Sequence, residues 1–255
     1  MGYTPPVRFL EYVIAGLGVG VGFGMFGAGG SAFATPVLAL FGVPPLIAVA
    51  SPLPAMLPAA FTGARRYLRA GNLDARVAKL AIIGGVPGTL LGALASTLVG
   101  GNRLLVLSGL MLLLIGIRLL MRDSRGAAER CSTRRGNTGL VVGSSFGVGL
   151  LTGLLANGGG FLLVPLFVLF LGLTAVEAAG TSMVVVGILT IPTLITHWAL
   201  GHIDWVVASG FAVGLVPAAA VGSRIAQRIP PARSRIAFGT MLVVFATWFL
   251  IYQLT

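Results

Sequence analysis

Two glycine clusters hold the residues of this chain best suited to binding chemistry. They are Gly29-Gly30-Ser31 and Asn157-Gly158-Gly159-Gly160, and each lies inside a long apolar stretch. Glycines at the end of an apolar helix should unwind it and leave backbone amides free to bind an anion. A new helix that begins at about Phe161 would add the partial positive charge of its N-terminus. The alternative is a tight turn at the membrane surface. Asn157 favours the anion site, because a buried amide side chain in a membrane needs a polar partner.

Three further polar residues lie close to each other in the second half of the chain. Glu177 could carry a proton as part of a coupling mechanism, because carboxylates inside membrane segments often do so. The sequence Thr174-Ala175-Val176-Glu177 also matches a capping box at a helix start, which is the interpretation we favour. Thr181 and Ser182, one turn further on, could contribute hydroxyl groups to a substrate site, and Ser51 is their counterpart in the first half.

The remaining chemically active residues are best explained by structural roles. Asp74 and Asp204 each follow a G-x-x sequence and suit the N-cap of the next helix. His197 and His202 are expected to form a pair at the membrane surface on one short loop, because zinc needs three or four ligands and no others are near. Cys131 is the single cysteine, so the sequence predicts no disulfide, no metal site and no cofactor.

The chain repeats itself, and this repeat positions the two glycine clusters. At an offset of about 129 or 130 residues, Gly29-Gly30 aligns with Gly158-Gly159, and Asp74 aligns with Asp204. Glycine and proline dominate the matches, so the halves share backbone breaks and close-packing points as well as hydrophobicity. We therefore divide the chain into a first membrane repeat at 1–121, a basic linker at 122–137 and a second membrane repeat at 138–255. Paired helix breaks in two repeats are typical of transporters with a site near the middle of the membrane.

Composition places both repeats in a membrane. Hydrophobic residues make up 56% of the 255 residues, charged residues make up 9%, and the mean hydropathy is +1.00. A soluble domain carries about 25% charged residues, so this chain cannot cover itself with a polar surface. The sequence predicts an all-α, polytopic integral membrane protein with half-length helices. The expected helices lie at about 8–27, 31–41, 45–66, 75–99, 103–121, 138–156, 160–171, 174–200, 204–228 and 232–254.

Basic residues give two possible topologies. Four crossings per repeat would leave twelve Lys and Arg residues in the cytoplasm and five outside. If the short segment of each repeat (31–41 and 160–171) counts as a fifth pass, the two repeats are inverted. Fifteen basic residues then face the cytoplasm, and only Arg8 and Arg103 lie outside. The positive-inside rule favours the inverted arrangement with a cytoplasmic linker. The rule also accounts for the net charge of +11, and no basic run is interleaved with aromatic residues, so we expect no nucleic-acid partner.

With these motifs in view, the chain resembles the sulfite exporter TauE/SafE family of bacterial membrane permeases over nearly its whole length. The resemblance rests on the two glycine clusters with Pro36 and Pro165, on Ala178-Ala179-Gly180-Thr181-Ser182, and on Gly201-His202-Ile203-Asp204. The first half departs from the family pattern at Ala50-Ser51-Pro52. The resemblance implies a multi-pass protein of the bacterial inner membrane that transports sulfur-containing anions such as sulfite or organosulfonates. It indicates this class of substrate but not which compound is transported.

Membrane physics adds an expected direction of transport. With a negative cell interior, outward movement of one negative charge is favourable by about 2.3 kcal/mol per 100 mV, so an exporter of anions needs no coupling ion. Only Glu11 and Glu177 are carboxylates inside predicted spans, which favours uncoupled export. The alternative is proton-coupled uptake of a small anion or sulfur compound. An enzyme would need converging His, Cys or carboxylate groups, and a scaffold subunit would have little reason for paired helix breaks. The sequence leaves the oligomeric state open.

Overall fold

The computed structural model describes residues 5–27, 33–99, 101–121, 137–155 and 160–254. These residues form helices joined by turns, with no strand in the described ranges, so the all-α prediction is confirmed. The helices of the first half are α1 (Pro5–Met25), α2 (Ala34–Leu40), α3 (Pro45–Ala50), α4 (Leu53–Arg69), α5 (Ala75–Val99) and α6 (Gly101–Met121). Those of the second half are α8 (Thr138–Leu155), α9 (Gly160–Leu169), α10 (Ala175–Ala199), α11 (Trp205–Ala226) and α12 (Pro231–Leu254).

One predicted helix is interrupted. The expected helix at 45–66 is split into α3 and α4 at Ser51 and Pro52, whereas α10 runs without a break. The residues of α10 that align with Pro52 and Pro54 are Ser182 and Val184. Proline has no backbone N–H and crowds the preceding turn, so the two prolines explain why only the first half is interrupted here.

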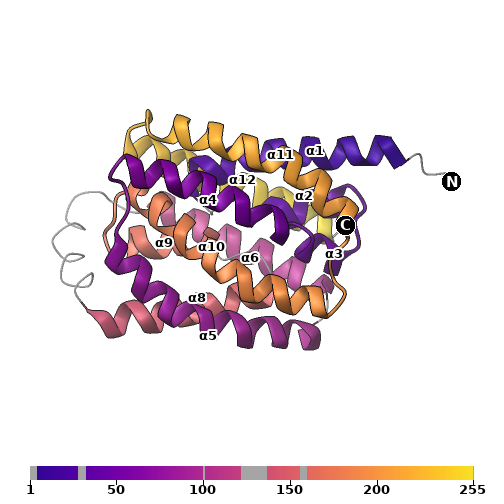
Figure 1. Cartoon of the computed structure of the whole chain (residues 1–255), viewed down its shortest axis with the longest axis horizontal. Helices are drawn as coiled ribbons and strands as arrows, with labels where there is room; N and C mark the ends of the chain where they lie inside the picture. Colours follow the sequence, from indigo (N-terminus) through magenta and orange to yellow (C-terminus); the bar gives the residue numbers. More distant parts are fainter. Residues whose placement is uncertain (1–4, 28–32, 100, 122–136, 156–159, 255) are drawn as a thin grey trace.

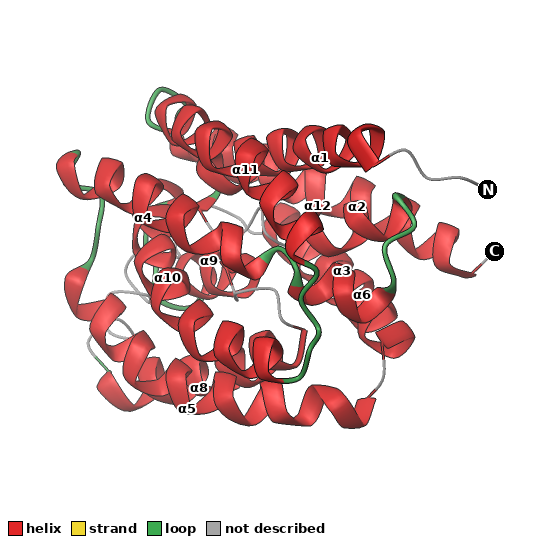
Figure 2. Cartoon of the chain, turned by 45° about the vertical axis from the view of Figure 1, so that its right-hand side comes forward, coloured by secondary structure: helices red, strands yellow, loops and turns green. Residues whose placement is uncertain are grey.

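The helices pack in pairs that join the two halves. α1 packs along α11, α5 packs along α8, α4 packs against α10, and α6 packs against α12. Figure 1 shows α1 and α11 along one edge of the bundle and α5 and α8 along the opposite edge. The view in Figure 2 keeps this order, with the other long helices between the two pairs. Each outer pair therefore combines the first helix of one half, α1 or α8, with the second-to-last helix of the other, α11 or α5.

Glycines set the separation within the two outer pairs. A Cβ added to Gly24 on α1 would collide with the backbone of Ala219 and Ser223 on α11. At the aligned position on α8, a Cβ added to Gly153 would collide with the backbone of Thr89 and Ala93 on α5. Helix backbones this close together require glycine at the contact, as small-residue interfaces do in membranes. The equivalent contacts of Gly24 and Gly153 are consistent with the internal repeat. The repeat itself remains a prediction.

The outer surface of the bundle suits a lipid environment. Six helical segments of the described chain are long and apolar enough to span a bilayer: Arg8–Met25, Pro45–Arg69, Ala75–Ala95, Ala175–Ala199, Trp205–Ala226 and Ala232–Ile251. Large apolar side chains are exposed on them, including Ile14, Leu94, Ile195 and Val244. Exposed apolar side chains of this size and number are costly in water, so this is a multi-pass membrane protein.

Four helix ends that carry basic residues gather at one end of the bundle. The end of α4, the start of α5, the end of α11 and the start of α12 lie together on the left in Figure 1, whereas both chain termini lie on the right. Arg65, Arg66 and Arg69 of α4 share a cleft with Gln227, the residue that caps the end of α11. Four parallel crossings per repeat would separate these two ends, so the placement supports the inverted arrangement.

Candidate functional site

The last described residue before the first helix break, Gly27, lies against α10. α1 ends at Met25, and Gly27 adopts a left-handed backbone with φ of 69°. A Cβ on Gly27 would fall 2.6 Å from both Ala179 Cα and Ser182 Oγ of α10. Only glycine combines this conformation with so close an approach. The described border of the first break is therefore fixed against the α10 segment that contains Thr181 and Ser182.

Tyr67 closes the end of α1. Its side chain is fully buried, and its hydroxyl donates a hydrogen bond of 3.0 Å to the Gly24 carbonyl and lies 3.3 Å from the Met25 carbonyl. The last carbonyls of a helix have no partner within the helix, so in lipid they need a donor from elsewhere. The sequence reasoning missed Tyr67. The sequence feature that could have identified Tyr67 is its alignment with His197 at the offset of 130 residues.

His197 occupies the corresponding position in the second half. It is buried in the last turns of α10, not on the loop where the sequence reasoning placed it, and its ring lies near the backbone of Gly153 of α8. Its Nδ1 lies 3.1 Å from Nδ1 of His202, and its Nε2 is buried with no hydrogen-bond partner among the described residues. The described residues contain no group of three or more His, Cys, Asp and Glu side chains that could hold a metal ion.

Two hydrogen bonds connect the first half of the chain to the second. Thr181 Oγ1 accepts a 3.0 Å hydrogen bond from the backbone N–H of Asp74, and Ser51 Oγ accepts one of 3.0 Å from the backbone N–H of Asp204. Both aspartates are the N-caps that the sequence predicts, because their Oδ1 atoms accept from the amides two and three residues further on. The Thr181 hydroxyl therefore has a structural contact, whatever else it binds.

Most of the other predicted site residues lie outside the described residues. Those are Gly29, Gly30, Ser31, Asn157, Gly158 and Gly159. Of the rest, Ser182 is fully buried beside Gly27, and its hydroxyl donates a 2.9 Å hydrogen bond to the Ala179 carbonyl. The Ser182 oxygen lies beside Gly27, at the border of the first break, and can still accept a hydrogen bond. The structure thus brings Ser182 to that border but leaves the proposed anion contacts as predictions.

Gly160 begins the half-length helix α9, one residue before the predicted start at Phe161. α9 has ten residues, which at about 1.5 Å per residue gives about 15 Å, or half of a 30 Å hydrocarbon core. The side chains from Leu162 to Val168 are all buried, and the first turn holds no acidic residue. Its N-terminal amides are therefore not satisfied by a carboxylate from that turn, and their partial charge attracts anions. The seven-residue helix α2 begins only at Ala34, three residues after Ser31.

Glu177 forms the capping box that we favoured. Its Oε2 accepts hydrogen bonds from the Thr174 backbone N–H at 2.9 Å and from the Thr174 hydroxyl at 3.1 Å. The Thr174 hydroxyl in turn accepts from the Glu177 backbone N–H at 3.2 Å. Both halves of the motif are present at the start of α10. The carboxylate thus has a structural role at the basic end of the bundle.

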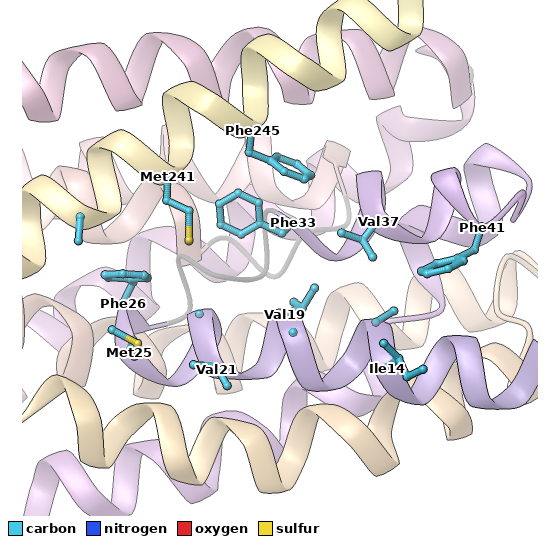
Figure 3. Close-up of a pocket in the computed structure, with 14 residues that line it drawn as sticks. Ile14, Val19, Val21, Met25, Phe26, Phe33, Val37, Phe41, Met241 and Phe245 are labelled. Carbon is cyan, nitrogen blue, oxygen red and sulfur yellow. The ribbon is translucent and has the colours of Figure 1, made fainter.

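Two cavities adjoin the first break. A cavity of about 600 Å³ lies between α1, α2 and α12, and the described side chains that line it are all apolar. Figure 3 shows Phe33, Met241 and Phe245 directed toward it. These apolar side chains offer an anion little. A much smaller cavity is lined by Phe26, which follows α1, and by Val164 and Val168 of α9. The border of the first break and the helix of the second therefore meet in the interior.

Known proteins resemble this chain over most of its length. A family model described as "Sulfite exporter TauE/SafE" matches residues 12–249. A "Probable membrane transporter protein" of Xylella fastidiosa (strain 9a5c) is 29% identical over 238 residues, which cover 90% of each chain. "Probable membrane transporter protein YunE" of Bacillus subtilis (strain 168) is 25% identical, with 88% of this chain and 89% of the relative covered. No solved structure matches the chain.

Proposed function

The chain belongs to the sulfite exporter TauE/SafE family of membrane transporters, and on this premise we propose that it exports sulfite or a related sulfur-containing anion, such as an organosulfonate, from the bacterial cell. It is a transporter and not an enzyme. Family membership and the apolar helices both place it in the bacterial inner membrane. The choice of anion, the direction of transport and the residues of the site are proposals.

The observation that carries the proposal is α9, a half-length helix buried in the bundle. Its N-terminus follows Asn157-Gly158-Gly159, and no carboxylate occupies its first turn. An oxyanion placed there would accept hydrogen bonds from the amides of the first turn and gain from the helix dipole. Ser182 supports the proposal, because it presents a buried hydroxyl at the border of the other break. We place the substrate between these two groups, with Gly29, Gly30 and Ser31 on the side of the first repeat.

Flux measurements test the proposed substrate and direction. Purified protein in liposomes is expected to carry sulfite, thiosulfate or a small sulfonate in the direction that an imposed membrane potential drives an anion, without a pH gradient. This follows because outward anion movement gains about 2.3 kcal/mol per 100 mV. Empty liposomes provide the control. Flux that needs a pH gradient would contradict uncoupled export, and no flux of any sulfur anion would contradict the substrate class.

Glu177→Gln tests whether the carboxylate carries a proton. We expect the variant to retain most of the potential-driven flux, because glutamine at the third position of a capping box also accepts a hydrogen bond from the N-cap backbone. The experiment compares initial rates for Glu177→Gln and the wild type at equal reconstitution. Thr174→Ala is the matched control for the cap itself. If the wild type requires a pH gradient and Glu177→Gln loses that requirement, Glu177 is a proton carrier.

The inverted topology predicts that the basic end of the bundle faces the cytoplasm. Cys131 in the linker should resist a membrane-impermeant maleimide in intact cells, as should a Gln227→Cys variant made in a Cys131→Ser background. A cysteine that replaces the exposed Leu200, at the opposite end between α10 and α11, should react rapidly. Both expectations follow from the positive-inside rule. Rapid labelling at Gln227→Cys would instead establish the parallel arrangement.

A further inference from the structure

A basic cleft lies at the end of α4, away from the proposed transport site. It has a volume of about 630 Å³ and is lined in part by Arg65, Arg66 and Arg69, with Phe61 and Thr62 one turn earlier and Gln227 of α11 opposite. Arg69 lies three positions after Arg66 and four after Arg65, so it neighbours both on the helix surface, and all three side chains line the cleft. None of the described residues that line the cleft is acidic.

The arginines of the cleft lack partners in the described part of the chain. Neither a hydrogen bond nor an ion pair to their guanidinium groups is found there, and Arg65 and Arg69 are exposed. The hydroxyl of Thr62 is already used, because it donates a 2.7 Å hydrogen bond to the Pro58 carbonyl. Like charges four residues apart on a helix repel each other. A bound anion would remove this repulsion and would accept hydrogen bonds from guanidinium groups that have no acceptor in the described ranges.

Packing does not require arginine at these positions. The residues of α10 that align with the three arginines at the offset of 130 are Ile195, Thr196 and Ala199, and α10 forms its helix equally well with them. The three arginine charges are therefore a feature of this end of the bundle and not a requirement of helix formation or packing. The positive-inside rule could be satisfied by basic residues anywhere on that end, so it does not explain why three of them line one cleft.

The apolar wall indicates which kind of anion fits. Phe61 lines the cleft and is 58% exposed, and it lies one helical turn before Arg65, on the side away from the end of α4. A lipid molecule presents this combination, with a phosphate at the interface and acyl chains beside it. We propose that the cleft binds the phosphate group of an anionic phospholipid of the cytoplasmic leaflet, with its acyl chain against Phe61. Arg66 and Arg69 hold the phosphate, and the Gln227 amide adds a donor from α11.

Native mass spectrometry of the full-length protein tests this site. The purified protein is titrated with phosphatidylglycerol and, separately, with phosphatidylcholine that has the same acyl chains. We expect the wild type to retain phosphatidylglycerol preferentially. Arg66→Gln/Arg69→Gln should weaken its apparent affinity for phosphatidylglycerol about thirtyfold, from about 1 kcal/mol for each basic residue at an anionic surface. Arg69→Gln alone, at an exposed position, should show a smaller loss in the same direction.

A matched variant separates a specific site from general charge. Arg118→Gln/Arg233→Gln removes the same charge from exposed residues outside the cleft and should leave the preference for phosphatidylglycerol unchanged. An equal loss of affinity in both double variants would overturn the proposal. A second arm replaces the lipid with inorganic phosphate. If inorganic phosphate alone displaces phosphatidylglycerol or raises the unfolding temperature to the same extent, the cleft binds a free oxyanion and the lipid assignment is wrong.

Discussion

Gly159→Leu is expected to abolish anion flux while the protein still inserts and folds. Gly159 immediately precedes α9, whose N-terminus carries the proposed anion site. A leucine side chain at this point would occupy the space that an anion needs to approach the backbone amides. Loss of the proposed contacts between the anion and the backbone amides should cost far more binding free energy than a substitution on the protein surface. We therefore expect flux at the level of empty liposomes.

Gly147→Leu provides the matched control for this prediction. Gly147 lies on α8 of the same repeat, and a Cβ added to it would meet no atom within 4 Å. The control variant should therefore transport at about the wild-type rate. Both variants are reconstituted at equal protein and compared by initial flux of the anion identified in the substrate screen. Unchanged flux in a well-folded Gly159→Leu protein would refute the proposed site.

Gly24→Val is expected to cause the largest loss of stability. The Cβ would collide with the Ala219 carbonyl and lie 2.8 Å from the Ser223 backbone nitrogen, so α1 and α11 would have to separate. Overpacking of a core typically costs about 1–3 kcal/mol, and the cost here should reach the upper end or exceed it because backbone atoms cannot rotate away. Separation would also break the hydrogen bond from Tyr67 to the Gly24 carbonyl. We expect little folded protein and a marked fall in unfolding temperature.

Gly18→Val on the same helix is the control for Gly24→Val. A Cβ at Gly18 would meet nothing within 4 Å, so this variant should unfold close to the wild-type temperature. Gly153→Val, at the aligned position of α8, should lose stability as Gly24→Val does. Thermal unfolding in one detergent, together with size-exclusion profiles, gives the comparison. Equal unfolding temperatures for Gly18→Val and Gly24→Val would show that the two helices do not approach as closely as described.

The sequence determined the class of the fold and most of its helices, because these depend on local patterns. Apolar length identified the spans, and glycine and proline marked where they stop. The capping residues Asp74, Asp204 and Glu177 were also predictable, since an N-cap contacts amides only two or three residues away. The split between α3 and α4 was missed, although Pro52 and Pro54 were visible, because apolar length outweighed their effect on the helix.

Only the tertiary structure decided which groups far apart in the sequence meet. The contact of Tyr67 with the end of α1, and those of Thr181 with Asp74 and Ser51 with Asp204, join residues between 42 and 153 positions apart. No local pattern encodes such contacts, because they depend on how closely the glycines let the helices approach. The same packing brings Arg66 and Gln227 to one cleft. The sequence alone thus determined a membrane protein with two broken helices, and the arrangement of the bundle decided what surrounds each break.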